Sequence, residues 1–200
     1  ILAERGVTVD HATLNRWVVK FSPLIAARMQ VKKRPTARSW RADETYIKVA
    51  GQWQYLYRAI DRDGNLVDVY LSETRDQEAA EALFRSAVAV TGTTPDKVTT
   101  DKHASYPPAL DEVFCDDLEH RTSKYLNNHL EQDHRAVKGR LRPMRGFQTH
   151  TSAARFCRAH DEVRDFLRPA TRRKEHVPAA RRRAIHVQRV AALRDMLAVA

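Results

Sequence analysis

Three segments rich in Val, Ile, Tyr and Trp follow one another with short breaks between them, and this arrangement strongly restricts the fold. The segments span residues 40–49, 52–61 and 66–72, and the breaks fall at Ala50-Gly51 and at residues 62–65. Short breaks that contain Gly, Asn or Asp between β-rich segments are typical of hairpin turns. The sequence therefore predicts three consecutive antiparallel strands.

The hydrophobic pattern changes to a helical period after the third segment. Apolar residues recur at helical spacing over 79–88, and Gly92 is placed to end that helix. A strand at 97–100 follows, and then a helix that begins at Pro107 or Pro108. A further strand is predicted at 118–121 and a further helix at 127–142. The order βββαβαβα predicts an α/β fold, a ribonuclease H-like mixed sheet flanked by helices.

The helix expected at 127–142 has two different faces. At helical spacing, one face carries Leu130, His134, Val137 and Leu141, and another carries Glu131, Arg135, Lys138 and Arg142. We expect the first face to pack. An acid followed by three bases suits a helix that holds a metal ion at one end and phosphates along the rest. The alternative is a solvated surface helix with a salt bridge between Glu131 and Arg135.

Three acids fall at positions that such a sheet can bring together. Asp43 lies in the first strand, Asp101 ends the fourth, and Glu131 lies on the helix after the fifth. Converging carboxylates repel one another unless hard cations neutralise them, which points to Mg²⁺ or Mn²⁺. Two such ions, roughly 3.5–4 Å apart, can activate a water or a DNA 3′-hydroxyl for attack on phosphorus. The alternative is that Asp43 is a solvent-facing acid of an edge strand and Asp101 a helix cap.

The charge distribution points to nucleic acid. The chain of 200 residues has a net charge of +10, and bases cluster at 31–41 and at 168–189. Clustered positive charge indicates nucleic acid first and a membrane surface second, whereas solvated tails are the alternative. No stretch is apolar enough to cross a bilayer and no signal peptide is visible, so we expect a soluble protein. Cys115 and Cys157 show no zinc or disulfide spacing, which favours a reducing compartment.

The first 20 residues suggest half of a helix-turn-helix. Residues 1–5 resemble a helix end, and a second helix from Asp10 to about Lys20 is expected to pack through Leu14, Trp17 and Val18 and to expose His11, Asn15 and Arg16. The second helix of such a motif enters the DNA major groove, although a plain helical hairpin is an alternative. The chain starts inside a predicted helix, so we expect a fragment that lacks the N-terminus.

The predicted organisation has four parts. They are a partial helix-turn-helix at 1–20, a basic linker at 21–39, the catalytic domain at 40–167 and a basic helical tail at 168–200. The linker contains Pro23 and Pro35 and a short helix at 24–29, and the domain ends with an amphipathic helix over 149–167. The tail either pairs with a partner chain or folds back.

Several other side chains have two interpretations. His134 orients Glu131 or a phosphate, or else is a hydrogen-bonded core histidine. His103 and His120 lie near the expected site without the spacing of a transition-metal site. Trp53, Tyr55 and Tyr57 share one strand face and are interpreted as core residues rather than base-stacking platforms.

The chain also resembles the DDE transposases of bacterial insertion sequences in the IS-six family, from about residue 1 to about residue 165. The resemblance rests on Trp40-Arg41-Ala42-Asp43-Glu44-Thr45-Tyr46-Ile47-Lys48-Val49, Trp53-Gln54-Tyr55-Leu56-Tyr57-Arg58-Ala59-Ile60-Asp61, Thr100-Asp101-Lys102, Glu119-His120-Arg121, and Asn127-Asn128 with Glu131, Asp133-His134 and Lys138. The chain departs from the family pattern in one place: the interval before Glu131 is shorter, which suggests a trimmed loop at 113–118.

The resemblance implies a divalent-metal-dependent enzyme in which Asp43, Asp101 and Glu131 bind two Mg²⁺ or Mn²⁺ ions. Such enzymes nick the 3′ ends of their own element and join them to target DNA, typically producing cointegrates. Lys138 is expected to contact DNA near the cleaved end, and the other expected DNA contacts are Arg135, Arg142, Asn15 and Arg16. The implied partners are double-stranded DNA, as terminal inverted repeats and target, and a second copy in a homodimer or higher synaptic complex, with no membrane.

Two rival functions remain open at this stage. A nuclease or resolvase of the same fold hydrolyses DNA without joining it. A DNA-binding regulator or inactive transposase relic uses only the half helix-turn-helix and the basic runs. The expected location of each is the bacterial cytoplasm, at the nucleoid.

Overall fold

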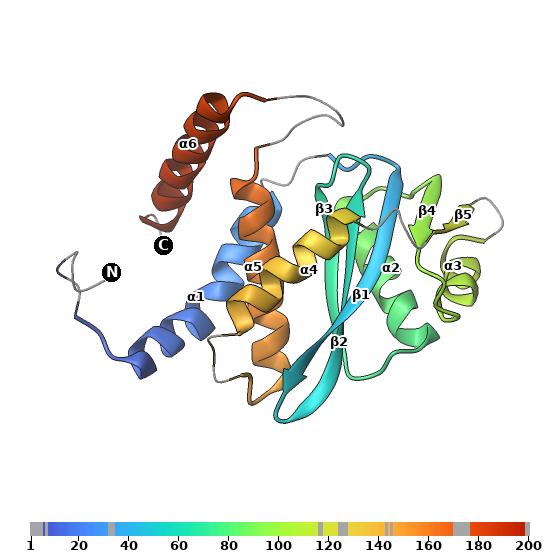
Figure 1. The fold of residues 1–200 in the computed structure, drawn as a ribbon, viewed down its shortest axis with the longest axis horizontal. Coiled ribbons are helices and arrows are strands. Elements are labelled where there is room, and N and C mark those ends of the chain that lie inside the picture. Colours follow the sequence, from blue (N-terminus) through green and yellow to red (C-terminus); the bar gives the residue numbers. More distant parts are fainter. Residues whose placement is uncertain are drawn as a thin grey trace.

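A computed structural model describes residues 6, 8–31, 35–115, 118–123, 128–142, 144, 146–169 and 177–198. Its centre is a five-stranded sheet in the order β3-β2-β1-β4-β5 (Figure 1). The strands are β1 (Ser39–Val49), β2 (Gln52–Asp61), β3 (Leu66–Ser72), β4 (Lys97–Thr100) and β5 (Glu119–Thr122). β1, β2 and β3 pair antiparallel, whereas β4 pairs parallel with β1 and with β5. The predicted ribonuclease H-like fold is confirmed.

Both predicted hairpin turns are present, and each has a local cause. Ala50 and Gly51 adopt positive φ angles of 48° and 83°, which a tight two-residue turn between twisted strands requires. In the second turn, Oδ1 of Asp61 accepts hydrogen bonds from the backbone N–H groups of Asp63 (2.9 Å) and Asn65 (2.8 Å). These local interactions fix the register of the three antiparallel strands.

The described residues form six helices: α1 (His11–Val31), α2 (Gln77–Thr91), α3 (Tyr106–Phe114), α4 (Asn128–Leu141), α5 (His150–Leu167) and α6 (Ala179–Ala198). α2 and α3 cover one face, and α4 and α5 lie on the other (Figure 1). Each face has its own apolar core, one centred on Phe84 and Tyr57 and the other on Leu56 and Val137. No helix in the described ranges is long and apolar enough to cross a membrane.

The helix predicted to end at about Lys20 instead continues to Val31, through Pro23. Its second half packs along α5 and buries Ala26 and Met29, so tertiary burial outweighs the hydrogen bond that a mid-helix proline removes. The prediction that Trp17 packs against the rest of the chain is also wrong, because this side chain is 43% exposed. The helix predicted at 1–5 lies outside the described residues, as do the side chains of Leu14 and Val18.

The two faces predicted for α4 are confirmed. Leu130, His134 and Val137 are buried. The side chains of the charged face are exposed, namely those of Glu131, Arg135, Lys138 and Arg142. The packing face meets β1 and α5, which turns the charged face away from the core.

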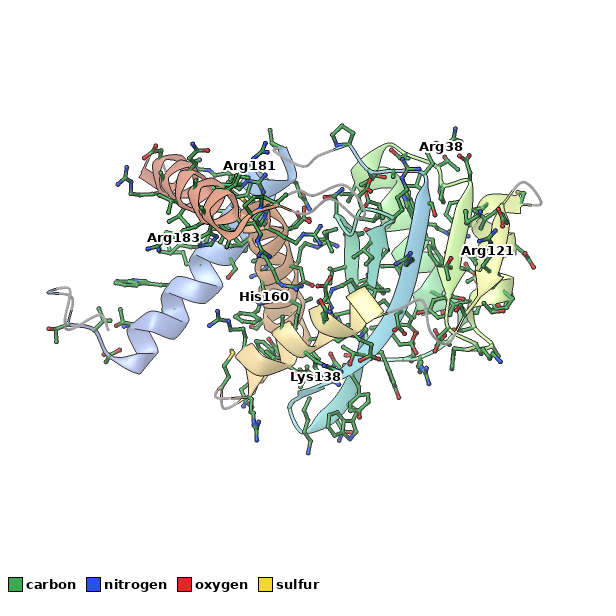
Figure 2. The ribbon with its side chains drawn as sticks, turned by 45° about the horizontal axis from the view of Figure 1, so that its top comes forward. Arg38, Arg121, Lys138, His160, Arg181 and Arg183 are labelled. Atoms are coloured by element: carbon green, nitrogen blue, oxygen red, sulfur yellow. The ribbon has the colours of Figure 1, made fainter. Side chains whose placement is uncertain are left out.

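The C-terminal helix α6 lies beside α5. Nη1 of Arg189 donates a hydrogen bond to the carbonyl oxygen of Phe166 over 2.6 Å. The Arg181, Arg182 and Arg183 side chains are exposed, and Figure 2 shows Arg181 and Arg183 extending from this helix. Of the two alternatives for the tail, this arrangement corresponds to folding back onto the chain.

Candidate active site

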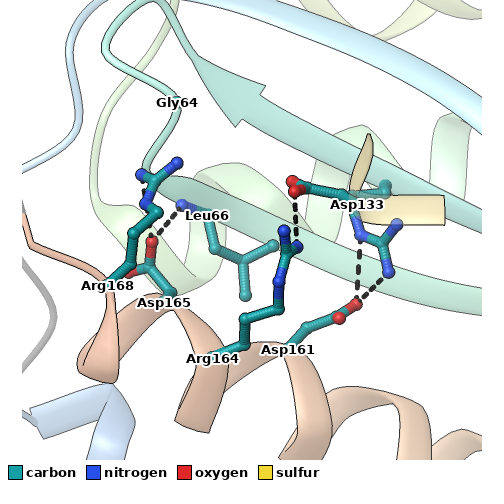
Figure 3. Close-up of a pocket in the computed structure, with 8 residues that line it drawn as sticks. Gly64, Leu66, Asp133, Asp161, Arg164, Asp165 and Arg168 are labelled. Atoms are coloured by element: carbon teal, nitrogen blue, oxygen red, sulfur yellow. Dashed lines mark hydrogen bonds and ion pairs between the residues drawn. The ribbon is translucent and has the colours of Figure 1, made fainter. Parts of the chain in front are cut away.

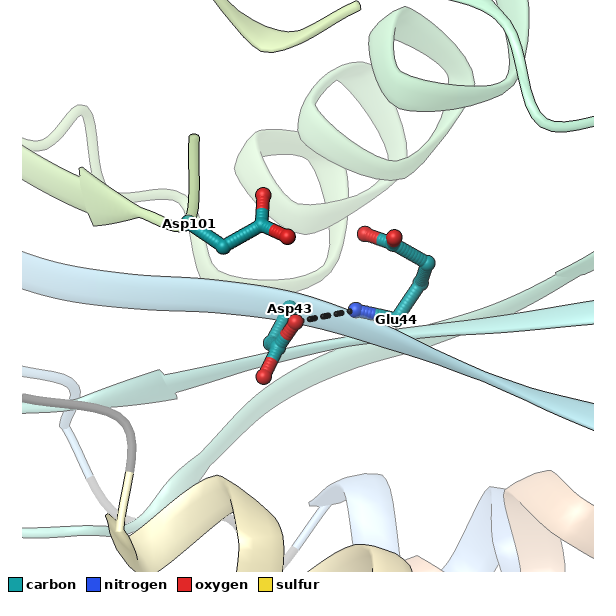
Figure 4. Close-up of side chains that lie close together, drawn as sticks. All are labelled: Asp43, Glu44 and Asp101. Carbon is teal, nitrogen blue, oxygen red and sulfur yellow. Dashed lines mark hydrogen bonds between the residues drawn. The ribbon is translucent and has the colours of Figure 1, made fainter. Parts of the chain in front are cut away.

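Asp43 and Asp101 are brought together by the parallel pairing of β1 with β4. Within the described residues, β4 pairs with β1 only at Ser39, Trp40 and Arg41, so Asp43 follows just beyond the last paired residue. Asp101 directly follows the last residue of β4. Together with Glu44, these acids form a set whose ligand oxygens all lie within 4.8 Å of one another (Figure 4).

Asp43 lies among several acidic side chains. Burial, followed by repulsion from Glu44, Asp101 and Glu131, raises the pKa of Asp43 to about 7. Among the described residues, the hydrogen bond that favours its charged form comes from the backbone N–H of Glu44, at 3.0 Å. Three carboxylates without enough cations form a donor set suited to a hard divalent ion. The alternative of Asp43 as an edge-strand acid fails, because β1 is the middle strand of the sheet.

Glu44 was not singled out from the sequence. Arg75 pairs with it through two guanidinium nitrogens, and Nε of Arg75 lies 2.6 Å from Oε1. The hydroxyl of the buried Tyr106 donates to the other oxygen of Glu44. Arg75 also lies 3.9 Å from Oδ2 of Asp101. Glu44 therefore has a cation and a hydrogen-bond donor of its own, in contrast to Asp43. The sequence signal that could have identified Glu44 is its position directly after Asp43.

Glu131 lies outside the three-carboxylate set but borders it. It lines a cavity of about 300 Å³ together with Glu44, Thr45, Tyr46, Tyr55, Arg75, His134, Arg135 and Lys138. Its charge contributes to the raised pKa of Asp43. In the described part of the chain, neither Glu131 nor Arg135 forms an ion pair, so the predicted alternative of a salt bridge between them is not observed.

His134 is buried, at 5% exposure, and lines the same cavity. Burial, and then the charges of Arg58 and Lys138, lower the pKa of His134 to about 3, so the imidazole is neutral at physiological pH. Its Nε2 has no hydrogen-bond partner among the described residues. It is a core histidine whose hydrogen bonding is incomplete on the side of Nε2.

The predicted DNA contacts occupy two separate places. Arg135 and Lys138 share the exposed face of α4, and the exposed Arg142 directly follows this helix. Nζ of Lys138 lies 4.3 Å from the centroid of the Tyr46 ring (Figure 2). Arg16 is exposed on α1, and the side chain of Asn15 lies outside the described part.

The other two histidines predicted to lie near the site, His103 and His120, form hydrogen bonds with neighbouring side chains. The Nε2 atom of His120 lies 2.9 Å from Oγ1 of Thr100, and Nδ1 of His103 lies 2.7 Å from Oγ of Ser105. The backbone N–H of His103 donates to Oδ1 of Asp101 at 2.9 Å, which orients that carboxylate. Among the described residues, neither histidine belongs to a set of metal-ligating side chains.

The three aromatic residues of β2 have different environments. Tyr57 is fully buried and Tyr55 packs partly against the core, as predicted. Trp53 is 56% exposed, so its interpretation as a core residue is wrong. The reason is its position next to the β1–β2 turn, beyond the part of the sheet that contacts α2 and α3.

Ion pairs behind the site fix α4 and α5 to the sheet. The fully buried Arg58 of β2 pairs with Asp161 of α5, and Arg164 of α5 pairs with Asp133 of α4 (Figure 3). Oδ1 of Asp165 accepts a hydrogen bond from the N–H of Leu66 at 3.0 Å. Although burial opposes it, Arg58 holds the pKa of Asp161 below its ordinary value. These contacts position the helix that carries Glu131.

Comparison with solved structures finds integrase cores among the neighbours. The catalytic core domain of HTLV-2 integrase, in its dimeric form with magnesium, has a TM-score of 0.48 and 17% sequence identity, and the alignment covers 62% of this chain and 87% of that chain. The trimeric form has a TM-score of 0.48 and 13% identity, and covers 76% of this chain and 97% of that one.

Sequence comparison finds transposases. The chain is 43% identical over 148 residues to the transposase for insertion sequence-like element IS431mec of Staphylococcus aureus strain Mu50, and 42% identical to the transposase for IS257 in transposon Tn4003 of Staphylococcus aureus. Both matches cover 70% of this chain and 64% of the relative. Residues 37–169 match a family model described as a DDE domain, DDE_Tnp_IS240. The chain belongs to this DDE-domain family of insertion-sequence transposases.

Proposed function

We propose that this chain carries the catalytic centre of a transposase, which nicks DNA at the ends of its element and joins the freed 3′ ends to target DNA. The observation that carries the proposal is the Asp43–Asp101 pair at the β1–β4 junction, whose negative charge is offset only in part by Arg75, 3.9 Å from Asp101, with Glu131 in the adjoining cavity. The family membership and the transposase names of the relatives support it.

Asp43, Asp101 and Glu131 would hold two divalent ions, Mg²⁺ or Mn²⁺. All three offer carboxylate oxygens, the donors that these ions prefer, and such ions would neutralise the acidic neighbours that, after burial, raise the pKa of Asp43. When bound, the ions supply Lewis-acid activation of the attacking hydroxyl and stabilisation of the leaving oxygen. Glu44 is the rival third ligand, but Arg75 and Tyr106 already bind its two oxygens.

The chain's own residues would position the DNA. Arg135 and Lys138 lie along the exposed face of the helix that carries Glu131, and Arg142 directly follows its last residue, so phosphates can follow this face away from the carboxylates. Asn15 and Arg16 on α1 would contact the terminal inverted repeat, within the proposed partial helix-turn-helix at 1–20. Linker 21–39, catalytic domain 40–167 and tail 168–200 remain the proposed divisions, and the first boundary falls inside the continuous helix α1.

The proposed partners are double-stranded DNA and a second copy of the chain. Two element ends and a target must meet in one reaction, which calls for a homodimer or a higher synaptic complex. Since the substrate is bacterial DNA, the proposed place of action is the cytoplasm, at the nucleoid. A regulator that only binds DNA is the second candidate, but DNA binding alone would not require the clustered carboxylates of Asp43, Asp101 and Glu131.

The test is metal-dependent cleavage of a labelled duplex that carries an end of the element flanking this gene. With Mg²⁺ or Mn²⁺, the chain should give a nicked product and a joined product, and chelation should remove both. Asp43→Asn and Asp101→Asn should remove both products, whereas Asp96→Asn, in an exposed pair with Arg38, should leave them unchanged. Nicked DNA without joined product would indicate a nuclease, and binding without either product would indicate the regulator.

A further inference from the structure

An exposed aromatic pair flanked by two lysines lies next to the candidate active site. Tyr46 of β1 and Trp53 of β2 are 54% and 56% exposed, and their rings meet edge to face with centroids 5.1 Å apart. Nζ of Lys138 lies 4.3 Å from the Tyr46 ring centroid, and Nζ of Lys48 lies 5.4 Å from that of Trp53. We call these four residues the aromatic platform.

The platform continues from the carboxylates along one strand. Glu44, Tyr46 and Lys48 alternate on the same face of β1, and two residues of a strand advance about 7 Å. This step corresponds to one or two nucleotides of an extended strand. Asp43 lies on the opposite face of β1 (Figure 4), but the cavity is lined by residues of both faces, Thr45 and Tyr46. A nucleotide beside a phosphate held at Asp43 and Asp101 would reach Tyr46 through this cavity.

A cavity adjoins the platform and offers both space and a polar partner. Its volume of about 300 Å³ is at the lower end of the range for small-ligand pockets, and Tyr46, Tyr55 and Lys138 line it. His134, 95% buried, lines the same cavity with an Nε2 atom that has no partner among the described residues. A heterocyclic base has ring nitrogens and exocyclic groups that can satisfy such an atom.

We infer that the aromatic platform binds an unpaired nucleotide next to the scissile phosphate, with the base against Tyr46 and Trp53 and the phosphates beside Lys48 and Lys138. Exposed aromatic faces combined with basic side chains are characteristic of single-strand binding, since every base has a ring face to stack. A duplex backbone would need only the charges. This inference rests on the proposed function, because it assumes a DNA end at the carboxylates.

The test uses a short duplex with a single-stranded 5′ overhang that carries 2-aminopurine as its first unpaired base, compared with a blunt duplex. No metal is added, so no strand is cut. The chain should bind the overhang duplex more tightly and quench the 2-aminopurine fluorescence. Tyr46→Ala and Trp53→Ala should weaken overhang binding about 5- to 140-fold, the range for loss of one base–aromatic stack, and leave blunt-duplex binding within about 2-fold. Trp53→Phe should retain the quenching.

Phe21→Ala is the matched control, because Phe21 is also an exposed aromatic, at 38%, with a lysine over its ring, but lies on α1. It should change neither binding nor quenching. Unchanged overhang preference in both platform variants would overturn the inference, and so would a dimer that Trp53→Ala converts to monomers with the overhang preference intact, since the platform would then be a protein interface. Metal-dependent nicking is measured separately, so it can persist when the platform inference fails.

Discussion

Asp43 makes the metal-free protein less stable than it would be with a neutral side chain. Its pKa is about 7 in the folded state because of burial and then its acidic neighbours, compared with about 4 in an unfolded chain. Between these values the folded state binds the extra proton, so the contribution of Asp43 to the unfolding free energy falls as pH rises from about 4 to 7.

Asp43→Asn is therefore expected to stabilise the metal-free protein at pH 8 by about 1–2 kcal/mol, after allowance for solvent screening at a half-buried group. The gain should disappear near pH 4. Urea denaturation at both pH values measures it, with Asp96→Asn as an exposed control that should stay within about 0.5 kcal/mol of wild type. A loss of stability at pH 8 would show that the charge of Asp43 is already compensated.

His134 has the opposite pH dependence. Its pKa is about 3 when folded, because of burial first, and about 6.5 when unfolded, so the unfolded state binds the extra proton between these values. Stability should fall as pH drops below about 6.5, by up to about 1.4 kcal/mol per pH unit. In His134→Gln this slope should be absent. The difference between the two denaturation curves from pH 7 to pH 4 isolates it, and parallel curves would rule out a buried neutral histidine.

At the residue scale, the three acids were predicted from the elements that carry them: Asp43 within a strand, Asp101 at the end of the neighbouring strand and Glu131 on a helix. This succeeded for the meeting of Asp43 and Asp101, since parallel neighbouring strands bring such positions together. Glu44 was missed although it directly follows Asp43, because its approach to Asp101 depends on where β1 stops pairing with β4, after Arg41, while it continues to pair with β2. Alternation likewise put Trp53 and Tyr57 on one face but could not show where the covering helices end.

At the scale of elements, the buried Arg58–Asp161 pair joins β2 to α5. Asp161→Asn should destabilise the protein by about 3–5 kcal/mol, because it leaves the Arg58 charge buried without a counter-charge. The double variant Arg58→Met, Asp161→Leu should recover most of this loss. Chemical denaturation of the two variants measures both effects. Arg85→Ala, which removes an exposed pair with Glu81, is the control and should cost less than about 1 kcal/mol. A double variant as unstable as the single one would contradict this explanation.

Elements with local causes were predictable, and those with tertiary causes were not. The hairpin turns, the left-handed cap at Gly92 and the Thr149 cap of α5 are encoded within a few residues, and the corresponding elements agree closely with expectation. The extension of α1 through Pro23 depends on burial against α5, which no local pattern records.

At the scale of the whole molecule, the net charge of +10 acts through exposed bases such as those of α6. Replacing Arg181, Arg182 and Arg183 by Gln should reduce the slope of log affinity against log salt for duplex DNA by up to about 3, if each contacts a phosphate. Fluorescence anisotropy at several KCl concentrations measures the slope. Arg85→Gln, already paired with Glu81, should leave it unchanged. An unaltered slope in the triple variant would mean that α6 does not contact DNA.

The most direct measurement compares Glu131→Gln with Glu44→Gln in Mg²⁺-dependent nicking and joining of the labelled element end. Glu131→Gln should abolish both products while the fold and the affinity for DNA are retained, since this glutamate is exposed and has no ion pair to lose among the described residues. Glu44→Gln should keep measurable activity, because its oxygens serve Arg75 and Tyr106. Full activity in Glu131→Gln, with none in Glu44→Gln, would contradict the account and assign the third metal-binding carboxylate to β1.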